Sequence, residues 1–196
     1  MSARDNILNR LRAVEVAEVQ KPQLDVASIR FEDRVAHFAD MVKAVGGEVV
    51  ELQGSLLETL SALGVDTENL VSACEELQGS ALNPDSVADV HELGGNYTAV
   101  ACGKVAVAEN GAVWTPVEGR RRAHLFACQH LVLVVSKTAV VDTMHDAMER
   151  ISLEDIAYGA FISGPSKTAD IEQALVMGAH GAMRATVILT ESSTKL

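Results

Sequence analysis

The run His130-Leu-Val-Leu-Val-Val135 decides the fold, because a continuous apolar segment of this length is typical of a strand covered on both faces. Glu48-Val-Val-Glu-Leu52 is expected as a strand before it, and Ala160–Ile162 and Thr186–Leu189 as short buried strands after it. Such strands, alternating with helical segments, predict an α/β fold with an open, mostly parallel sheet flanked by helices. We expect residues 1–196 to form a single domain.

Helices are predicted between these strands. The clearest one has apolar residues spaced by four, three, four and three: Phe31, Val35, Phe38, Val42 and Val45. Residues 2–19 show an amphipathic pattern, and we expect an N-terminal helix within 1–20 that packs as an arm on the body or on another chain. Further helices are expected at about 56–63, at 137–150 and from about 168.

The centre of the chain carries a hairpin signal. Tyr97–Ala108 is rich in Val, Ala and Thr and is expected to pair with a strand at Val113–Thr115. Between them lies Glu109-Asn110-Gly111, and Asn-Gly is the strongest short signal for a hairpin turn. Another strand is expected around Asn69–Cys74.

Composition narrows the function classes. The 196 residues include 16 Lys and Arg against 27 Asp and Glu, a net charge of −11. This balance argues against binding to nucleic acid or to an anionic membrane, both of which need a basic face. No apolar run approaches the roughly 20 residues of a membrane-spanning helix, and the first residues lack the apolar segment of a secretory signal, so a cytoplasmic location is expected. The three cysteines are far apart and odd in number, so no disulfide framework is expected.

The acidic charge is concentrated in the first half of the chain. Residues 1–100 hold 7 basic and 17 acidic residues, whereas residues 101–196 hold 9 and 10. In the second half, the apolar Phe161-Ile162 leads into Ser163-Gly-Pro-Ser-Lys-Thr168, where a new helix would begin. Free backbone N–H groups there, together with Lys167, could bind an anion. The same residues could also form only a tight turn with a helix cap.

Taken together, Ser163-Gly-Pro-Ser-Lys-Thr-Ala-Asp-Ile-Glu172, Gly178-Ala-His-Gly181 and Thr186-Val-Ile-Leu189 resemble the C-terminal signature of the LUD family, which is named for lactate utilization. The opening Ser2-Ala-Arg-Asp-Asn-Ile-Leu and the chain length are similar to its stand-alone members. The family's Gly-x-His-Gly-Pro ends here in Ala182, and its central Ala-Glu-Thr-Gly reads Ala108-Glu-Asn-Gly111.

The resemblance implies the fold of the ribose-phosphate isomerase, glucosamine-phosphate deaminase and CoA-transferase group, in which ligands lie beyond the carboxyl ends of the strands. We therefore predict one cleft that joins the hairpin tip to the 163–181 segment. Its predicted ligand-binding residues are Asn110, Gly164, Ser166, Lys167, Thr168, Asp170 and His180.

Glu109 is the candidate catalytic residue. Ala108-Glu-Asn-Gly111 is similar to the Ser-Glu-Asn-Gly motif of class I CoA transferases, whose glutamate is the nucleophile. Alternatively, Glu109 is a solvated residue of a hairpin turn. His180 likewise faces either a ligand or the last carbonyls of a helix.

Two other groups of residues carry weaker signals. Arg120-Arg-Arg122 forms either an anion-binding loop or a solvated surface. The spacing of His124, Cys128 and His130 could suggest a metal, but a tetrahedral site needs a fourth ligand and the sequence shows none. We therefore predict no metal site.

The resemblance implies a non-redox component of an iron–sulfur system that oxidises L-lactate to pyruvate. The chain has no closely spaced cysteines for a cluster and no GxGxxG motif at a strand–helix junction, so we expect no cofactor in it and place the iron–sulfur clusters on partner proteins. Its partners would be those subunits and a small anionic ligand, with the oligomeric state left open. The alternative is a stand-alone enzyme of the CoA-transferase or sugar-phosphate isomerase fold group that uses Glu109.

Overall fold

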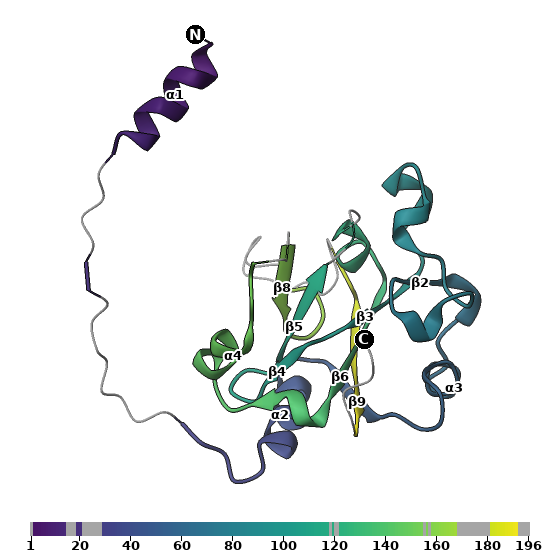
Figure 1. Ribbon diagram of the computed structural model, residues 1–196. Coiled ribbons are helices and arrows are strands. Elements are labelled where there is room, and N and C mark those ends of the chain that lie inside the picture. The colour runs from purple at the N-terminus through teal and green to yellow at the C-terminus, as the bar shows by residue number, and fades with distance from the viewer. Residues whose placement is uncertain are drawn as a thin grey trace, which may run out of the picture.

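The structure is a computed structural model that describes residues 2–14, 19–20, 29–117, 119, 122–154, 156, 158–167 and 181–191. Within these residues the larger sheet has five strands, all parallel, in the order β1-β9-β6-β3-β2 (Figure 1). Its strands are β1 Glu48–Glu51, β2 Leu70–Ser72, β3 Thr98–Cys102, β6 His130–Ser136 and β9 Arg184–Thr190. The predicted α/β fold with a mostly parallel sheet is confirmed.

A second sheet of four strands, in the order β7-β4-β5-β8, was not predicted. Its strands are β4 Val105–Val107, β5 Ala112–Val117, β7 Val140–Val141 and β8 Tyr158–Ile162. β5 runs antiparallel to both β4 and β8. The predicted hairpin is therefore present, whereas the segment at 160–162 belongs to this sheet and not to the parallel one.

The single strand expected over Tyr97–Ala108 is wrong, because the chain changes sheets at Gly103. β3 ends at Cys102 and β4 begins at Val105. A Cβ atom on Gly103 would overlap the side chain of Val113, so a larger residue would force the two sheets apart. Gly103 and Lys104 interrupt the apolar run at this point, and a glycine within a strand pattern is the local signal of such a break.

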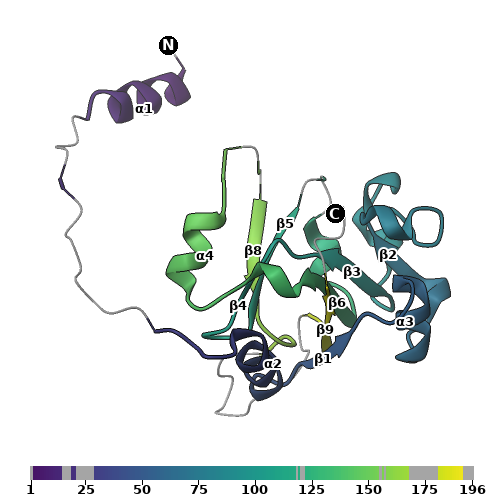
Figure 2. The same ribbon diagram turned by 60° about the horizontal axis from the view of Figure 1, so that its bottom comes forward.

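Helices α2 (Arg34–Ala44), α3 (Leu56–Ala62) and α4 (Met144–Arg150) cover the sheets in separate layers (Figure 2). Leu60 of α3 shares a buried cluster with Val132 and Ile188 on one face of the parallel sheet. On the other face, α2 and the second sheet form a common core. It includes Phe38, Val42, Ala99, Val113, Leu133 and Val187. α4 covers the outer face of the second sheet, where Ala147 packs in a cluster with Val107 and Trp114.

The predicted helix at 137–150 begins later than expected. A 3₁₀ turn at Lys137–Ala139 and strand β7 precede it, and the helix starts at Met144. Thr143 caps it and exchanges hydrogen bonds with Asp146, three residues into the helix. Val140 and Val141 are β-branched and pair with β4, which favours a strand at these positions.

The N-terminal helix is also shorter than its amphipathic pattern suggested. α1 spans Ala3–Arg12, none of its residues is buried, and it stands apart from the sheets in both views (Figures 1 and 2). Packing of this arm on the body is therefore not seen, and its packing on another chain stays a prediction. The helix expected from about 168 lies outside the described residues.

Short 3₁₀ helices complete the connections: η1 Thr67–Asn69, η2 Glu75–Leu77, η3 Pro84–Ser86, η4 Val90–Leu93, η5 Arg122–Leu125 and η6 Lys137–Ala139. Across the described ranges, no helix has both the length and the apolar character needed to cross a membrane.

Candidate functional site

The predicted hairpin tip is built by its own backbone contacts. Asn110 accepts a hydrogen bond from the Ala112 N–H through its side-chain oxygen, at 3.1 Å. Gly111 has a φ of +66°, which a residue with a side chain rarely adopts. A Cβ atom there would also lie 2.8 Å from the backbone nitrogen of Val42 in α2. The Asn-Gly pair therefore shapes the turn and allows it to contact α2.

Glu109 belongs to the hairpin turn, and its side chain lies against the N-terminus of α4. Its side chain is exposed, and its Oε2 accepts a hydrogen bond from the Met144 N–H at 2.9 Å. Its own N–H donates to the Asp142 carbonyl at 2.9 Å. A carboxylate at this position stabilises the N-terminus of a helix. Glu109 thus has a structural contact in addition to the catalytic role predicted for it, and that role stays a prediction.

A charged groove lies beside this helix start. Arg30 contacts Asp142 at 3.2 Å and Asp146 at 2.7 Å, and these residues line a hollow of about 170 Å³ with Arg34, Glu149 and Arg150. The hydrogen bond from Arg30 lowers the pKa of Asp146. Arg30 is thus paired with both aspartates, and Glu109, whose N–H donates to the Asp142 carbonyl, lies next to these ion pairs.

The structure brings part of the predicted 163–181 segment to the hairpin tip. The Ser163 hydroxyl donates to the Asn110 carbonyl at 2.9 Å. Gly164 packs so closely on α2 that a Cβ would lie 2.8 Å from the Val45 carbonyl oxygen. The Ser166 N–H donates to the Ala182 carbonyl at 2.8 Å, and Lys167 is exposed.

The rest of that predicted cluster stays a prediction. Thr168, Asp170 and His180 lie outside the described residues, as do Arg120 and Arg121. Arg122 is described, and its guanidinium lies 5.1 Å from the centre of the Tyr158 ring. This contact places it against an aromatic side chain of β8.

The histidines considered as metal ligands are buried in the fold. His130 is 7% exposed, and its Nε2 lies 2.8 Å from the Thr186 hydroxyl. Burial lowers the pKa of His130 and favours the neutral ring. Among the residues with described positions, no group of three or more His, Cys, Asp or Glu side chains could hold a metal ion.

A different site appears at the carboxyl ends of β2 and β3. A cleft of about 240 Å³ opens where this edge of the parallel sheet meets the end of β5. Its apolar lining includes Ala73, Pro84, Val100, Ala101, Pro116, Val117 and Leu125, and its polar lining includes Glu75, Asp85, Lys104 and His124. Mostly apolar walls with a few polar groups are typical of small-molecule sites.

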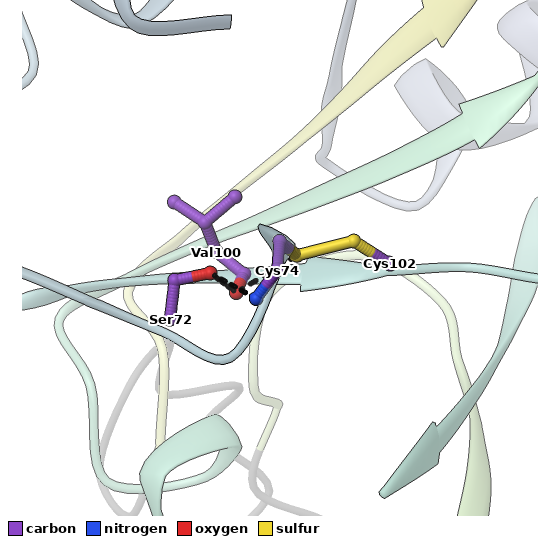
Figure 3. Close-up of a disulfide and its surroundings, with 4 residues drawn as sticks. All are labelled: Ser72, Cys74, Val100 and Cys102. Atoms are coloured by element: carbon purple, nitrogen blue, oxygen red, sulfur yellow. Dashed lines mark hydrogen bonds between the residues drawn. A yellow bond between two sulfur atoms is a disulfide. The ribbon is translucent and has the colours of Figure 1, made fainter. Parts of the chain in front are cut away.

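Cys74 and Cys102 also line this cleft and are joined by a disulfide (Figure 3). No disulfide framework was expected, and this single disulfide between two of the three cysteines was not predicted. The residues are 28 apart in sequence, but β2 and β3 are adjacent and parallel, so their carboxyl ends bring the two Cα atoms to 6.4 Å. A pair of cysteines at the ends of two neighbouring strands is the signal that could have revealed it.

None of the predicted site residues with described positions, namely Glu109, Asn110, Gly164, Ser166 and Lys167, lines this cleft. The predicted site residues come from the hairpin motif and the glycine-containing segment at 163–181, each of which is a continuous stretch of sequence. The cleft instead combines residues from the chain segment after β2, from β3 and β5, and from η2, η3 and η5, which span more than 50 positions in sequence. Such a site depends on strand order, which no local pattern contains.

Comparisons with known proteins agree with the family resemblance. The family model of the LUD domain matches residues 97–190. A lactate utilization protein C from Geobacillus thermodenitrificans is 37% identical over 99 residues, which are 46% of this chain and 40% of that protein. Its namesake from Bacillus pumilus is 37% identical over 92 residues, or 43% of this chain and 38% of that one. The matched segment thus spans about two fifths of the length of these relatives.

A solved structure supports the fold. The crystal structure of a DUF162 family protein from Deinococcus radiodurans is similar to this chain with a TM-score of 0.58 and 15% identity. The likeness covers 80% of this chain and 96% of that one. The resemblance to the LUD family is therefore confirmed, and residues 97–190 are the part of this chain that matches the LUD domain.

Proposed function

We propose that the chain acts in lactate utilization, in the cytoplasm, as a non-redox component of an iron–sulfur system that oxidises L-lactate to pyruvate. The observation that carries this proposal is the 36–37% identity to proteins named lactate utilization protein C. The sequence has no closely spaced cysteines that could hold an iron–sulfur cluster. The clusters of such a system would therefore reside on partner proteins.

The same proposal includes a small anionic ligand, which we place in the cleft beside β2 and β3. In open parallel sheets, ligands bind beyond the carboxyl ends of the strands, and Ala73 and Cys102 lie at these ends. A volume of about 240 Å³ is below the roughly 300–1,000 Å³ of drug-sized sites, which favours a ligand of few atoms.

Charge determines how an anion would enter this cleft. Lys104 is the one lysine or arginine in the described lining, while Glu75 and Asp85 would repel a carboxylate. A monocarboxylate would therefore direct its charged end to Lys104 and its carbon chain to the apolar wall. The predicted cluster at Asn110, Gly164, Ser166 and Lys167 is the competing location.

Recovery of partners tests the pathway role. The tagged chain is isolated from its native cells grown on L-lactate and, as a control, on pyruvate. We expect iron-containing proteins to be recovered with it from lactate-grown cells, and deletion of the gene to stop growth on L-lactate but not on pyruvate. Recovery of the chain alone, together with unimpaired growth on L-lactate, would contradict the proposal.

Calorimetric titration with L-lactate and with pyruvate tests the ligand. We expect Lys104→Met to weaken binding at least tenfold, or about 1.4 kcal/mol, Lys104→Arg to weaken it less, and Lys167→Met to leave it unchanged. If Lys167→Met weakened binding and Lys104→Met did not, the ligand would instead bind at the predicted cluster. Absence of saturable binding of either compound to the unmodified chain would remove these anions from the proposal.

A further inference from the structure

The disulfide between Cys74 and Cys102 sits in the wall of the cleft and not in the core of the fold. Cys102 is the last residue of β3, and Cys74 follows β2 by two residues (Figure 3). Cys102 is partly exposed, and both residues line the opening of about 240 Å³. The bond is therefore within reach of a small reagent or of a slender chain that enters the cleft.

The two cysteines are held close together by contacts that do not involve the sulfur–sulfur bond. β2 and β3 pair in register from Leu70 with Thr98 to Ser72 with Val100. The Ser72 hydroxyl donates to the Val100 carbonyl at 2.8 Å and accepts from the Cys74 N–H at 3.0 Å. These hydrogen bonds would remain after reduction, so the thiols would stay in position to form the bond again.

The thiol of reduced Cys74 would also have a hydrogen-bond acceptor. The Val100 carbonyl oxygen lies 3.8 Å from the sulfur of Cys74, so a thiol at that position has an acceptor. Neither redox state therefore requires the surrounding strands to rearrange.

Cys128 provides the contrast within the same molecule. It is a free cysteine, 2% exposed, and it lies outside the cleft lining. Burial raises its pKa to about 11. A buried thiol of this kind reacts with alkylating reagents only when the protein unfolds. Labelling of Cys128 therefore indicates unfolding, whereas labelling of Cys74 and Cys102 indicates reduction of their disulfide in the folded protein.

We propose that Cys74 and Cys102 form a thiol–disulfide exchange site that is reduced by dithiols in the cleft. A thiolate of the dithiol attacks the sulfur of Cys102, the more exposed residue of the pair, the sulfur–sulfur bond breaks, and Cys74 leaves as a thiolate that takes up a proton. The second thiol of the dithiol then attacks the mixed disulfide and releases Cys102 as a thiol. The protein pair gains two electrons and two protons, and the dithiol leaves as its own disulfide.

Alkylation followed by intact mass measurement tests the exchange on the full chain. The protein is equilibrated without denaturant in mixtures of reduced and oxidised dithiothreitol, then quenched with iodoacetamide. We expect two labels to appear together in one two-electron transition, with Cys128 unlabelled and near-ultraviolet circular dichroism unchanged. Labelling of Cys128 in the same transition, resistance to reduction unless denaturant is present, or two labels in every mixture would each overturn the proposal.

Single substitutions assign the attacked sulfur. Cys128→Ser should keep the two-electron transition, whereas Cys102→Ser and Cys74→Ser should each abolish it. With oxidised glutathione, the Cys74→Ser protein should form a mixed disulfide at Cys102 at least tenfold faster than the Cys102→Ser protein forms one at Cys74. Equal or reversed rates would contradict attack at Cys102. The titration of the unmodified chain remains decisive if a variant does not fold, and none of these measurements depends on lactate or on an iron–sulfur partner.

Discussion

The hairpin tip and the cleft differ in what their residues surround. At the tip, the Glu109 carboxylate accepts from Met144, the Asn110 amide accepts from Ala112, and the Asn110 carbonyl accepts from Ser163. These contacts all serve to hold backbone segments together. In the cleft, polar side chains lie around a hollow with mostly apolar walls. Residues that resemble a catalytic motif can thus be engaged in folding, whereas the cleft is lined by residues that form no motif.

Substitution at the tip should therefore change stability first. We expect Gly111→Ala to lower the free energy of unfolding by about 3 kcal/mol. The alanine would have to adopt the positive φ of this position, and its Cβ atom would overlap the backbone of α2. Gly79→Ala is the matched control, since Gly79 has a φ of +84° and no atom within 4 Å of a new Cβ. It should cost only about 1 kcal/mol. Urea unfolding measures both, and equal losses would show that the α2 contact does not matter.

Removal of the Glu109 contact should have a smaller effect. Glu109→Ala should cost about 1 kcal/mol, because the Met144 N–H loses its acceptor, and Glu109→Gln should cost less because its amide oxygen can still accept. Growth on L-lactate should continue with Glu109→Gln if the role is structural. Loss of growth by a stably folded Glu109→Gln protein would favour the nucleophile instead, and both regions would then carry function.

Acid should weaken the parallel sheet, whose edge forms part of the cleft, through His130. Burial lowers the pKa of His130, so the unfolded chain takes up a proton at a higher pH than the folded chain. The free energy of unfolding should therefore fall as the pH drops below about 6.5, the ordinary histidine value. His130→Gln should show a flatter dependence between pH 8 and pH 5.5 in urea unfolding. An unchanged pH dependence in the His130→Gln protein would contradict this explanation.

The rim of the cleft should tolerate substitution with the least effect on stability. Glu75 is exposed, so Glu75→Gln should change the free energy of unfolding by less than about 0.5 kcal/mol. It should nevertheless strengthen the binding of pyruvate, because one repelling carboxylate is removed from the lining. Calorimetry at low salt measures this change. Unchanged binding at low salt, where surface charges act over longer distances, would place the anion elsewhere.

Local patterns predicted many of the separate elements. The apolar run at 130–135 forms a central strand of the parallel sheet. The apolar spacing from Phe31 to Val45 predicted a helix, and α2 lies there, at Arg34–Ala44. The Asn-Gly turn lies where it was predicted. These elements depend on periodicity and on backbone preferences, both of which act over a few residues. The predictions for 97–108 and 137–150 were wrong about where each segment changes structure, because contacts with other strands determine these positions.

By itself, the sequence determined the fold class, the family resemblance and the hairpin. The pairing of β2 with β3 was decided only by the tertiary structure, and with it the disulfide and the cleft. The physical reason is that hydrophobic periodicity specifies which face of an element is buried but not which element lies beside it. Strand order arises from the packing of the whole core, and the carboxyl ends that form the cleft meet only after that order is established.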